Sequence, residues 1–250
     1  MTSSPHTGFG IDFGGTGCKG APVDLDKGAF AAERVRVKTP ANSSPDIIAG
    51  LFADLVAQFP DSTCPIGVTV PGIVRNGVVS SAANIDKSWI GTDADALFTE
   101  ALKRDVHVVN DADAAGLAEV RYGAARGQQG LVIVTTLGTG IGSALIYDGT
   151  LVPNSELGHL HLQGHGAAEK WAANSVRQAE DLSWKEWAHR LSVYYQTLEA
   201  LFSPELFVVG GGISKESADF LPLLEIATPI VPATLRNQAG IIGAALYANR

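Results

Sequence analysis

The segment Asn110-Asp111-Ala112-Asp113 places two carboxylates directly after an apolar run and at the start of an alanine-rich, helix-like stretch. A carboxylate in this position can accept the proton of an alcohol during phosphoryl transfer. It can equally do no more than cap the helix, because capping also needs an acidic or polar side chain at a helix start. Asp111 is therefore the first candidate for a catalytic base. Asp113 is expected to be a solvated charge of the first turn.

Two glycine-rich segments follow apolar runs and could present backbone N–H groups to an anion. They read Asp12-Phe13-Gly14-Gly15-Thr16-Gly17 and Leu137-Gly138-Thr139-Gly140-Ile141-Gly142. Neither contains the GxxxxGK[ST] pattern of a P-loop, and neither has GxGxxG with a helix directly behind it. Each is then either a hairpin that binds phosphate oxygens through its backbone or an ordinary tight hairpin. The presence of two such loops, one of them beside Asp12, favours phosphate binding.

A third polar cluster contains Glu156, His159 and Glu169. Histidine and carboxylate at short spacing can bind a metal, but no cysteine lies near them, so the indication of zinc is weak. A carbohydrate site needs several polar groups for the sugar hydroxyls, and these three side chains would serve.

The composition is typical of a globular enzyme, with 46% hydrophobic residues, 18% charged residues and 28 glycines. The net charge of −8 argues against nucleic acid as a partner, because sequence-independent binders carry a basic surface. Two cysteines, Cys18 and Cys64, are too few for a disulfide framework. No apolar run approaches the ~18 residues of a membrane helix, and the first residues lack a secretory pattern. We therefore expect a cytoplasmic protein with no membrane partner.

Apolar, β-branched runs of strand length alternate with helical patterns along the chain. The expected strands are Gly8–Phe13, Ile66–Val70, Val106–Val109, Leu131–Leu137 and Leu206–Val209, and the expected helices are Pro45–Gln58, Ala112–Tyr122, Glu169–Leu201 and Ala239–Ala248. This alternation predicts an α/β protein with a partly parallel sheet. Ligands of such sheets bind beyond the carboxyl ends of the strands, where the glycine turns and Asp111 fall. The amphipathic stretch from Glu169 to Leu201 is also a candidate dimer face.

The two glycine loops belong to a weak internal repeat. Each leads from one strand-like run into another, and each second run ends in a turn, at residues 24–28 or 147–149. This pattern predicts two similar halves that face a cleft. Two copies are too few for a solenoid.

Taken in order, the motifs IDFGGTGCKG, NDADAAG, TTLGTGIGSAL, ELGH and VVGGGIS resemble the ROK group of sugar kinases. The segments SAANIDKSWIGTDA, PNSELGHL and TPIVPATLRNQAGIIGAAL resemble the bacterial polyphosphate glucokinases of that group. The resemblance covers nearly the whole chain and implies the actin-like ATPase (ribonuclease H-like) duplicated fold. It implies two α/β domains that flank a cleft: a small one of residues 1–109 plus 236–250 and a larger one of residues 110–235. A homodimer, common among the resembling proteins, is the expected assembly.

The same resemblance implies a role for each candidate residue. Asp111 would be the catalytic base, and Asp12 would bind Mg²⁺ directly or through water. The sugar would be bound by Asn84, Asn110, Glu156, His159 and Glu169. The donor would be bound by Gly14, Gly15, Thr16 and Lys19 in the first loop, by Gly138, Thr139 and Gly140 in the second, and, for a nucleotide, by Gly211 and Gly212.

One departure from the group is clear. Many ROK proteins carry a cysteine-rich zinc motif after ELGH, whereas this chain reads LQGHGAAEKW there. We therefore expect no structural zinc, and we expect His159 to meet the sugar. ROK transcriptional regulators add an N-terminal helix-turn-helix domain. We expect none here, because the first predicted strand begins at Gly8.

The expected reaction is phosphoryl transfer from polyphosphate, and also from ATP, to the 6-hydroxyl of glucose, with mannose as a further acceptor. Two alternatives remain open: an ATP-only hexose kinase, and a sugar-binding regulator or scaffold without catalysis. A polyanionic donor needs local cations in a protein of net charge −8. The candidates are Lys87, Lys103, Arg104, Arg121 and Arg126.

Overall fold

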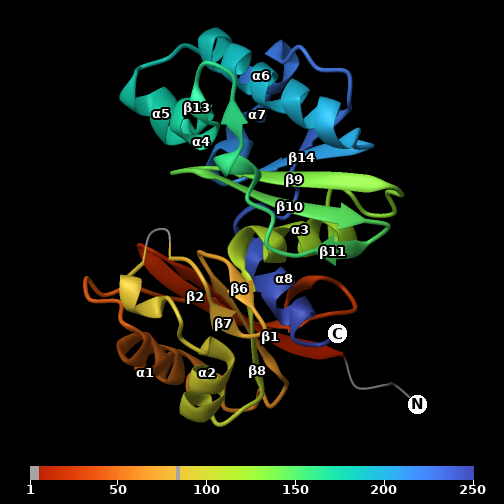
Figure 1. Cartoon of the computed structure of the whole chain (residues 1–250). Helices are drawn as coiled ribbons and strands as arrows, with labels where there is room; N and C mark the ends of the chain where they lie inside the picture. The colour runs from red at the N-terminus through yellow and green to blue at the C-terminus, as the bar shows by residue number, and fades with distance from the viewer. Residues whose placement is uncertain (1–5, 83–84) are drawn as a thin grey trace. The chain divides into compact units, whose positions relative to one another are not determined.

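The computed structural model describes residues 6–82 and 85–250 (Figure 1). The chain forms two compact units, Met1–Ala118 with Gln238–Arg250 and Glu119–Asn237. The first boundary therefore lies inside helix α3 (Asp111–Tyr122), not before it as the sequence suggested, because the start of α3 packs against the C-terminal helix of the first unit. Across the described residues, no helix is both long enough and apolar enough to cross a membrane.

The first unit is built on a six-stranded sheet of order β3-β2-β1-β5-β8, in which β4 also pairs with β2. Strands β1 and β2 are antiparallel, whereas β1, β5 and β8 run parallel. A second, two-stranded sheet joins β6 and β7. The elements of the unit are β1 (Thr7–Gly14), β2 (Gly17–Asp24), β3 (Ala29–Phe30), β4 (Val35–Val37), α1 (Pro45–Val56), β5 (Ile66–Val70), β6 (Val74–Arg75), β7 (Val78–Val79), η1 (Lys87–Trp89), α2 (Ala94–Leu102), β8 (Val106–Asn110), the start of α3, and α8 (Ala239–Tyr247).

Strand β1 shows how this sheet is covered. Phe9, Ile11 and Phe13 alternate along it and are buried in the core formed with α1 and α2. The opposite face carries Gly10 of β1 and Gly67 of β5, and a Cβ on either glycine would collide with the backbone of α8. Helix α8 therefore packs directly on the backbone of this face, a close approach that only glycine permits.

The second unit is built on a five-stranded sheet of order β11-β10-β9-β14-β15. Strands β9, β10 and β11 are antiparallel, and β14 and β15 run parallel to β9. This order repeats that of the first unit and confirms the prediction of two similar halves. The elements are β9 (Leu131–Leu137), β10 (Ile141–Tyr147), β11 (Thr150–Val152), η2 (Leu157–His159), β12 (His161–Leu162), β13 (Gly166–Ala167), α4 (Glu169–Ala172), α5 (Asn174–Ala179), α6 (Trp184–Phe202), β14 (Leu206–Gly210), η3 (Gly212–Glu216), α7 (Ser217–Phe220), η4 (Leu221–Leu223), β15 (Ile230–Pro232) and η5 (Arg236–Gln238).

All five predicted strands are confirmed, as are three of the four predicted helices. The prediction of one continuous helix from Glu169 to Leu201 is wrong, because this segment forms α4, α5 and α6. The breaks fall at Ala173, which is extended, and at Asp181, which has a φ of 51°. Helix α6 then restarts with a capping box between Ser183 and Glu186. Such a box satisfies backbone N–H groups at a helix start. It therefore favours a new helix at this point, even though the apolar residues keep a helical spacing through the whole stretch.

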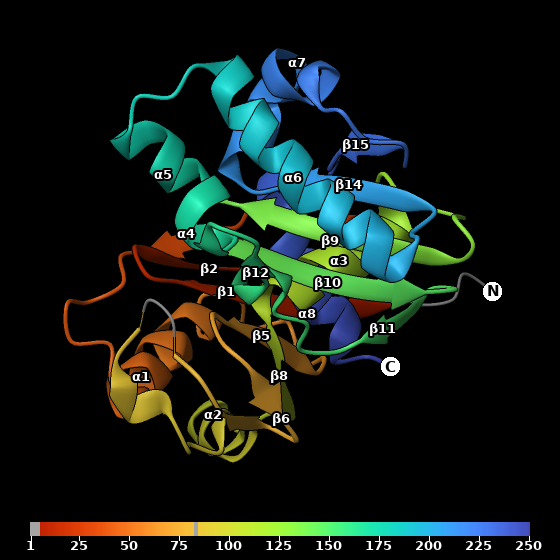
Figure 2. The ribbon, with the colours of Figure 1, turned by 45° about the horizontal axis from the view of Figure 1, so that its top comes forward.

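Helix α6 crosses one face of the second sheet (Figure 2). It contributes aromatic side chains to the core of the second unit. Trp187, Tyr194 and Tyr195 are fully buried, and the hydroxyl of Tyr195 lies 2.7 Å from Thr135 Oγ1 on β9. The apolar stripe of α6 is therefore core of its own unit, and the dimer face predicted for the stretch from Glu169 to Leu201 stays a prediction.

Candidate active site

Asp111 lies at the carboxyl edge of the first sheet, where β8 passes into α3. The preceding residue, Asn110, caps this helix, because its Oδ1 accepts from the N–H groups of Ala112 and Asp113 over 2.8 and 3.0 Å. Asn110 also donates from Nδ2 to the carbonyl of Gly72 over 3.0 Å and is buried. The capping role thus falls mainly to Asn110. The carboxylate of Asp111, which accepts from the N–H of Ala112 over 2.9 Å, is exposed.

Asp113 does not have the environment that the sequence suggested. We expected a solvated first-turn charge, but only 1% of the residue is exposed. The reason is the packing of α8 on the start of α3, where Gly243 leaves no room for a Cβ against the backbone of Ala114. Burial lowers the pKa of Arg250, and electrostatic interactions with Tyr247 and then Asp113 oppose that shift. Of the two acids, only Asp111 is accessible for chemistry.

Asp12 lies on the face of the first sheet that α8 covers. Its Oδ2 lies 2.8 Å from Nζ of Lys19 on β2, and its Oδ1 accepts from the hydroxyl of Thr69 over 3.2 Å. Thr69 also accepts from the N–H of Phe13 over 3.1 Å. Thr69 was not identified from the sequence, although a lone hydroxyl residue in the buried run of β5 was an available signal. Because β1, β5 and β8 are parallel neighbours, Asp12, Thr69 and Asp111 belong to one edge of one sheet.

The first glycine loop is a two-residue turn between β1 and β2. The register pairs Gly14 with Gly17, so Gly15 and Thr16 form the exposed tip. Thr39, which follows β4, donates from its hydroxyl to the carbonyl of Gly14 over 2.6 Å. This bond ties the edge strand β4 to the loop and holds the tip in place.

The second glycine loop joins β9 to β10 through Gly138, Thr139 and Gly140. Ser175 holds it from α5: its N–H donates to the carbonyl of Gly138 over 3.0 Å and its hydroxyl to that of Thr139 over 2.6 Å. A Cβ on Gly140 would meet Oε2 of Glu169. The loop therefore lies directly beside a predicted sugar-binding residue.

The structure brings together three of the predicted sugar-binding residues in the second unit. His159 lies between two carboxylates, with Nδ1 3.9 Å from Glu156 and Nε2 3.9 Å from Glu169. The imidazole is 63% exposed, whereas the carboxylate side chains are 29% and 17% exposed. Burial raises the pKa of Glu156, while the charge of His159 lowers it and that of Glu169 raises it. The arrangement offers acceptors and one imidazole to a polyhydroxylated ligand.

A pair of serines positions Glu156. Ser143 on β10 donates to the carbonyl of Ser155 over 2.9 Å, and Ser155 donates to the carbonyl of Ser143 over 3.0 Å. Ser143 also accepts from the N–H of Leu157 over 2.9 Å. Gly158 lets this turn approach β10 closely, because a Cβ there would meet the carbonyl of Ile141. The sequence did not predict this pair of hydrogen bonds. It shows Ser143 as a serine inside an apolar run, but it does not show that Ser155 is its partner.

Gly211 and Gly212 follow β14 and are exposed. Gly211 has a φ of 84°, and a Cβ on it would meet the backbone of Leu137 at the start of the second glycine loop. Gly212 has open space around its Cβ position. The structure therefore places this glycine turn against the second glycine loop, and the donor-binding role of both stays a prediction.

The remaining predicted residues are dispersed. Asn84 lies outside the described residues. Lys103 and Arg104 precede β8, at the edge of the sheet opposite Asp111, and Arg104 donates to the carbonyl of Cys64. Lys87 donates to the carbonyl of Ala82. The two further candidate cations, Arg121 and Arg126, are exposed side chains of the second unit.

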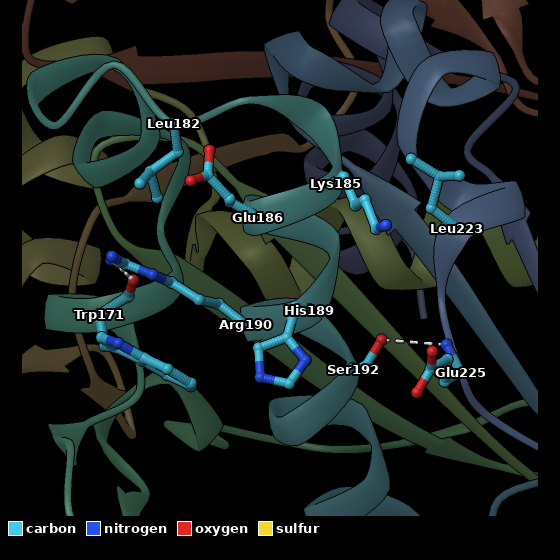
Figure 3. A pocket seen from close by; sticks show the side chains of 9 residues that line it. All are labelled: Trp171, Leu182, Lys185, Glu186, His189, Arg190, Ser192, Leu223 and Glu225. Atoms are coloured by element: carbon cyan, nitrogen blue, oxygen red, sulfur yellow. Dashed lines mark hydrogen bonds between the residues drawn. The ribbon is translucent and has the colours of Figure 1, made fainter.

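A separate pocket of about 810 Å³ lies beside α6 in the second unit (Figure 3). Its lining mixes charges of both signs: Trp171, Leu182, Lys185, Glu186, His189, Arg190, Ser192, Leu223 and Glu225. Several of these groups already have partners. Arg190 donates to the carbonyl of Trp171 and pairs with Glu180 at 2.6 Å, and Ser192 accepts from the N–H of Glu225. No predicted site residue lines this pocket.

Asp12 fits the role predicted for it with Mg²⁺. This ion is usually held by one or two carboxylates together with substrate phosphates, not by a complete protein cage. Asp12 offers one ordered carboxylate next to the first glycine loop. Within residues 6–82 and 85–250, no group of three or more His, Cys, Asp or Glu side chains could hold a metal ion. The prediction that the protein lacks structural zinc stays a prediction.

Comparison with known proteins finds relatives that match nearly the whole chain. The polyphosphate glucokinase of Mycobacterium tuberculosis (strain CDC 1551 / Oshkosh) is 49% identical over 246 residues, which cover 98% of this chain and 92% of that protein. The crystal structure of the inorganic polyphosphate/ATP-glucomannokinase from Arthrobacter sp. strain KM is 55% identical, with a TM-score of 0.91 and coverage of 97% and 98% of the two chains. The ROK hexokinase from Thermus thermophilus is 26% identical, with a TM-score of 0.77 and coverage of 97% and 98%.

These likenesses confirm the predicted fold, the two-domain actin-like ATPase fold of the ROK sugar kinases. The sequence model of the ROK family itself matches residues 8–170. This chain therefore belongs to the ROK family.

Proposed function

We propose that this protein transfers a phosphoryl group from inorganic polyphosphate, and also from ATP, to the 6-hydroxyl of glucose, with mannose as a second acceptor. The observation that carries the proposal is the exposed carboxylate of Asp111 at the same sheet edge as the Asp12–Lys19 pair. A proton acceptor and a phosphate-binding hairpin at one edge are what transfer to an alcohol requires. The likeness to a polyphosphate glucokinase and a polyphosphate/ATP-glucomannokinase over nearly the whole chain supports this choice of substrates.

In this mechanism the 6-hydroxyl oxygen of the sugar attacks the terminal phosphorus of the donor. The bond from that phosphorus to its bridging oxygen breaks, and the donor leaves one phosphate shorter. Asp111 accepts the hydroxyl proton as the new bond forms. Most of the acceleration comes from positioning and from charge stabilisation, because the protein forms no covalent intermediate in such a reaction.

The first glycine loop and Lys19 bind the donor end in this proposal. The exposed tip at Gly15 and Thr16 presents backbone groups to phosphate oxygens, and Lys19 adds a positive charge held in place by Asp12. Asp12 would hold Mg²⁺ together with the donor phosphates. When bound, this ion supplies positive charge that offsets the charge of the transferring group.

The second unit contributes the sugar contacts. Glu156, His159 and Glu169 lie together and offer both acceptors and an imidazole to the sugar hydroxyls. The second glycine loop borders Glu169, and Gly211 borders that loop, so donor and sugar residues of this unit are contiguous. Asn110 contributes by capping α3 and thereby fixing where Asp111 projects.

The test is a steady-state assay of the purified full chain with glucose or mannose and with polyphosphate, ATP or no donor. The proposal expects sugar 6-phosphate with either donor and none without a donor. Product with ATP alone would support the ATP-only hexose kinase. Sugar binding by calorimetry without product from either donor would identify a non-catalytic sugar-binding protein and would overturn the proposal.

A further inference from the structure

A cationic side chain that belongs to no predicted site lies beside the first glycine loop. We infer that Arg36 on β4 binds the phosphates of the donor that follow the terminal ones, and that it favours polyphosphate over ATP. This inference rests on the proposed function and extends it to a residue that selects the donor.

The sheet register places Arg36 next to the donor residues. Strand β4 pairs with β2 so that Arg36 lies opposite Lys19, and β2 pairs with β1 so that Lys19 lies opposite Asp12. Directly opposed residues of antiparallel strands project to the same face of the sheet. Asp12, Lys19 and Arg36 therefore form a row across three strands, with about 4.8 Å between neighbouring strands.

The glycine at the end of the loop shows where the guanidinium lies. A Cβ on Gly17 would lie 2.9 Å from Nε and 3.3 Å from an Nη of Arg36. The guanidinium therefore lies over Gly17, where a side chain would have displaced it. The bond from the Thr39 hydroxyl to the carbonyl of Gly14 anchors the end of this strand to the same loop. The pairing of β4 with β2 and the bond from Thr39 to Gly14 thus place Arg36 beside the loop.

The two cations of this row, Lys19 and Arg36, differ in whether they already have an acidic partner. Lys19 is already paired with the carboxylate of Asp12 at 2.8 Å. Arg36 is exposed, and its guanidinium makes no ion pair or side-chain hydrogen bond within residues 6–82 and 85–250. A guanidinium can donate two parallel hydrogen bonds to phosphate oxygens, so it suits an anion that approaches from solvent.

The two donors differ at the point where Arg36 would act. Both end in phosphates that the loop and Lys19 can bind. Beyond these, polyphosphate continues with one negative charge or more per unit, whereas ATP continues as a neutral ribose and base. Arg36 lies one strand beyond Lys19, so it meets the part of the donor that differs. In a protein of net charge −8, such a local cation is needed to hold a polyanion.

A second explanation for Arg36 is protection of the sheet edge. Strand β4 is an edge strand, and exposed cations on edge strands discourage pairing with other chains. This explanation predicts effects on aggregation and none on the use of donors.

The experiment compares three substitutions at Arg36 with Lys27→Gln. Lys27 is an exposed cation of the same unit, but it lies in the turn at the other end of β2 from the first glycine loop, where it pairs with Asp24. Each variant is assayed with glucose and with ATP or polyphosphates of defined length, at constant ionic strength. Arg36→Gln is expected to raise KM for long polyphosphate roughly fivefold to tenfold, in keeping with loss of one charge-assisted contact. KM for ATP should change by less than about twofold on the same scale, and Lys27→Gln should change neither.

The charge and the hydrogen-bonding capacity of residue 36 should together order the variants. Arg36→Lys is expected to lose less affinity for polyphosphate than Arg36→Gln, because it keeps the charge, and Arg36→Glu is expected to lose more than Arg36→Gln. Unchanged KM for polyphosphate, an equal rise for both donors, or a failure of this order would each overturn the assignment. A wild-type protein that makes no sugar phosphate from polyphosphate would instead overturn the proposed function, so the two failures are distinguished by the wild type alone.

Discussion

Lys19 Nζ lies 2.8 Å from Asp12 Oδ2, directly across the β1–β2 hairpin. The pair is about one quarter exposed and borders the first glycine loop. A surface ion pair of this kind typically contributes little to stability, so its interest lies in its position beside the loop. In the proposed function, Lys19 supplies positive charge to the donor, and the carboxylate of Asp12 holds Lys19 in place.

Replacement of Lys19 by Gln is expected to lower kcat/KM about 100-fold, the weight of one electrostatic donor aimed at a transferring group. The measurement is steady-state turnover with both donors. Lys27→Gln is the matched control, because Lys27 also pairs with an aspartate, Asp24 at 2.7 Å, but lies in a turn at the other end of β2. Equal losses in the two variants would show that the Lys19 effect is not local to the donor site.

Replacement of Asp111 by Asn is expected to lower kcat by roughly 10²–10⁴, the usual contribution of a general base. Binding of glucose, measured by calorimetry, should change little. Asp46→Asn is the control, because Asp46 is an exposed acid in the first turn of α1 in the same unit. Near-normal turnover by a folded Asp111→Asn protein would refute the base assignment.

Replacement of Gly140 by Ala is expected to raise KM for glucose about tenfold, which corresponds to about 1.4 kcal/mol. The added Cβ would meet Oε2 of Glu169 and would displace a carboxylate proposed to bind the sugar. Gly138→Ala, in the same loop, has open space at the Cβ position and should leave KM for glucose unchanged. If both variants or neither raise KM for glucose, Gly140 does not act through Glu169.

The affinity for glucose is expected to fall as the pH falls through the raised pKa of Glu156. Burial is the main cause of that raised pKa, with His159 lowering it and Glu169 raising it. The protonated form is a poorer acceptor for a sugar hydroxyl, so KM for glucose rises in mild acid, above the ordinary value of 4.5. Glu156→Gln should have a higher KM throughout and a flatter profile in this range. An identical pH profile in wild type and variant would exclude Glu156 as the titrating group.

The raised pKa of Glu156 also makes the stability of the folded protein depend on pH, and in the opposite direction: stability falls as the pH rises. Because the folded pKa of Glu156 lies above its unfolded value, its contribution to stability is full below the unfolded pKa and is lost as the pH rises through the folded pKa. Thermal unfolding of wild type and Glu156→Gln across this range checks the sign. Here wild type should lose stability relative to the variant as the pH rises.

Replacement of Gly67 by Ala is expected to destabilise the first unit by about 1–3 kcal/mol or more, because the added methyl would collide with the backbone of α8. Gly50→Ala is the control. Gly50 is exposed in the interior of α1 with open space at its Cβ position, and alanine there should stabilise the helix by about 0.5–1 kcal/mol. Denaturant unfolding measures both, and a neutral Gly67→Ala would contradict the close packing of α8.

Much of this protein is determined by local sequence. The five predicted strands, β1, β5, β8, β9 and β14, are short apolar runs that lead into glycine, Pro-Gly or Asn-Asp, and such endings are visible without any partner. The paired glycine loops predicted the repeated strand order of the two sheets. Asp111 could be selected as a candidate base, and Glu156, His159 and Glu169 as one cluster, because each set is close in sequence.

Only the tertiary structure decided which of these side chains is accessible and what holds them. Asp113 is buried because α8, more than 120 residues away in the chain, packs on α3. Arg36 lies over Gly17 because strand register, not sequence distance, sets the neighbours of a residue in a sheet. The same holds for Ser143 with Ser155 and for Thr69 with Asp12. Periodicity and turn chemistry are local properties, whereas burial and pairing depend on segments that meet only when the chain has folded.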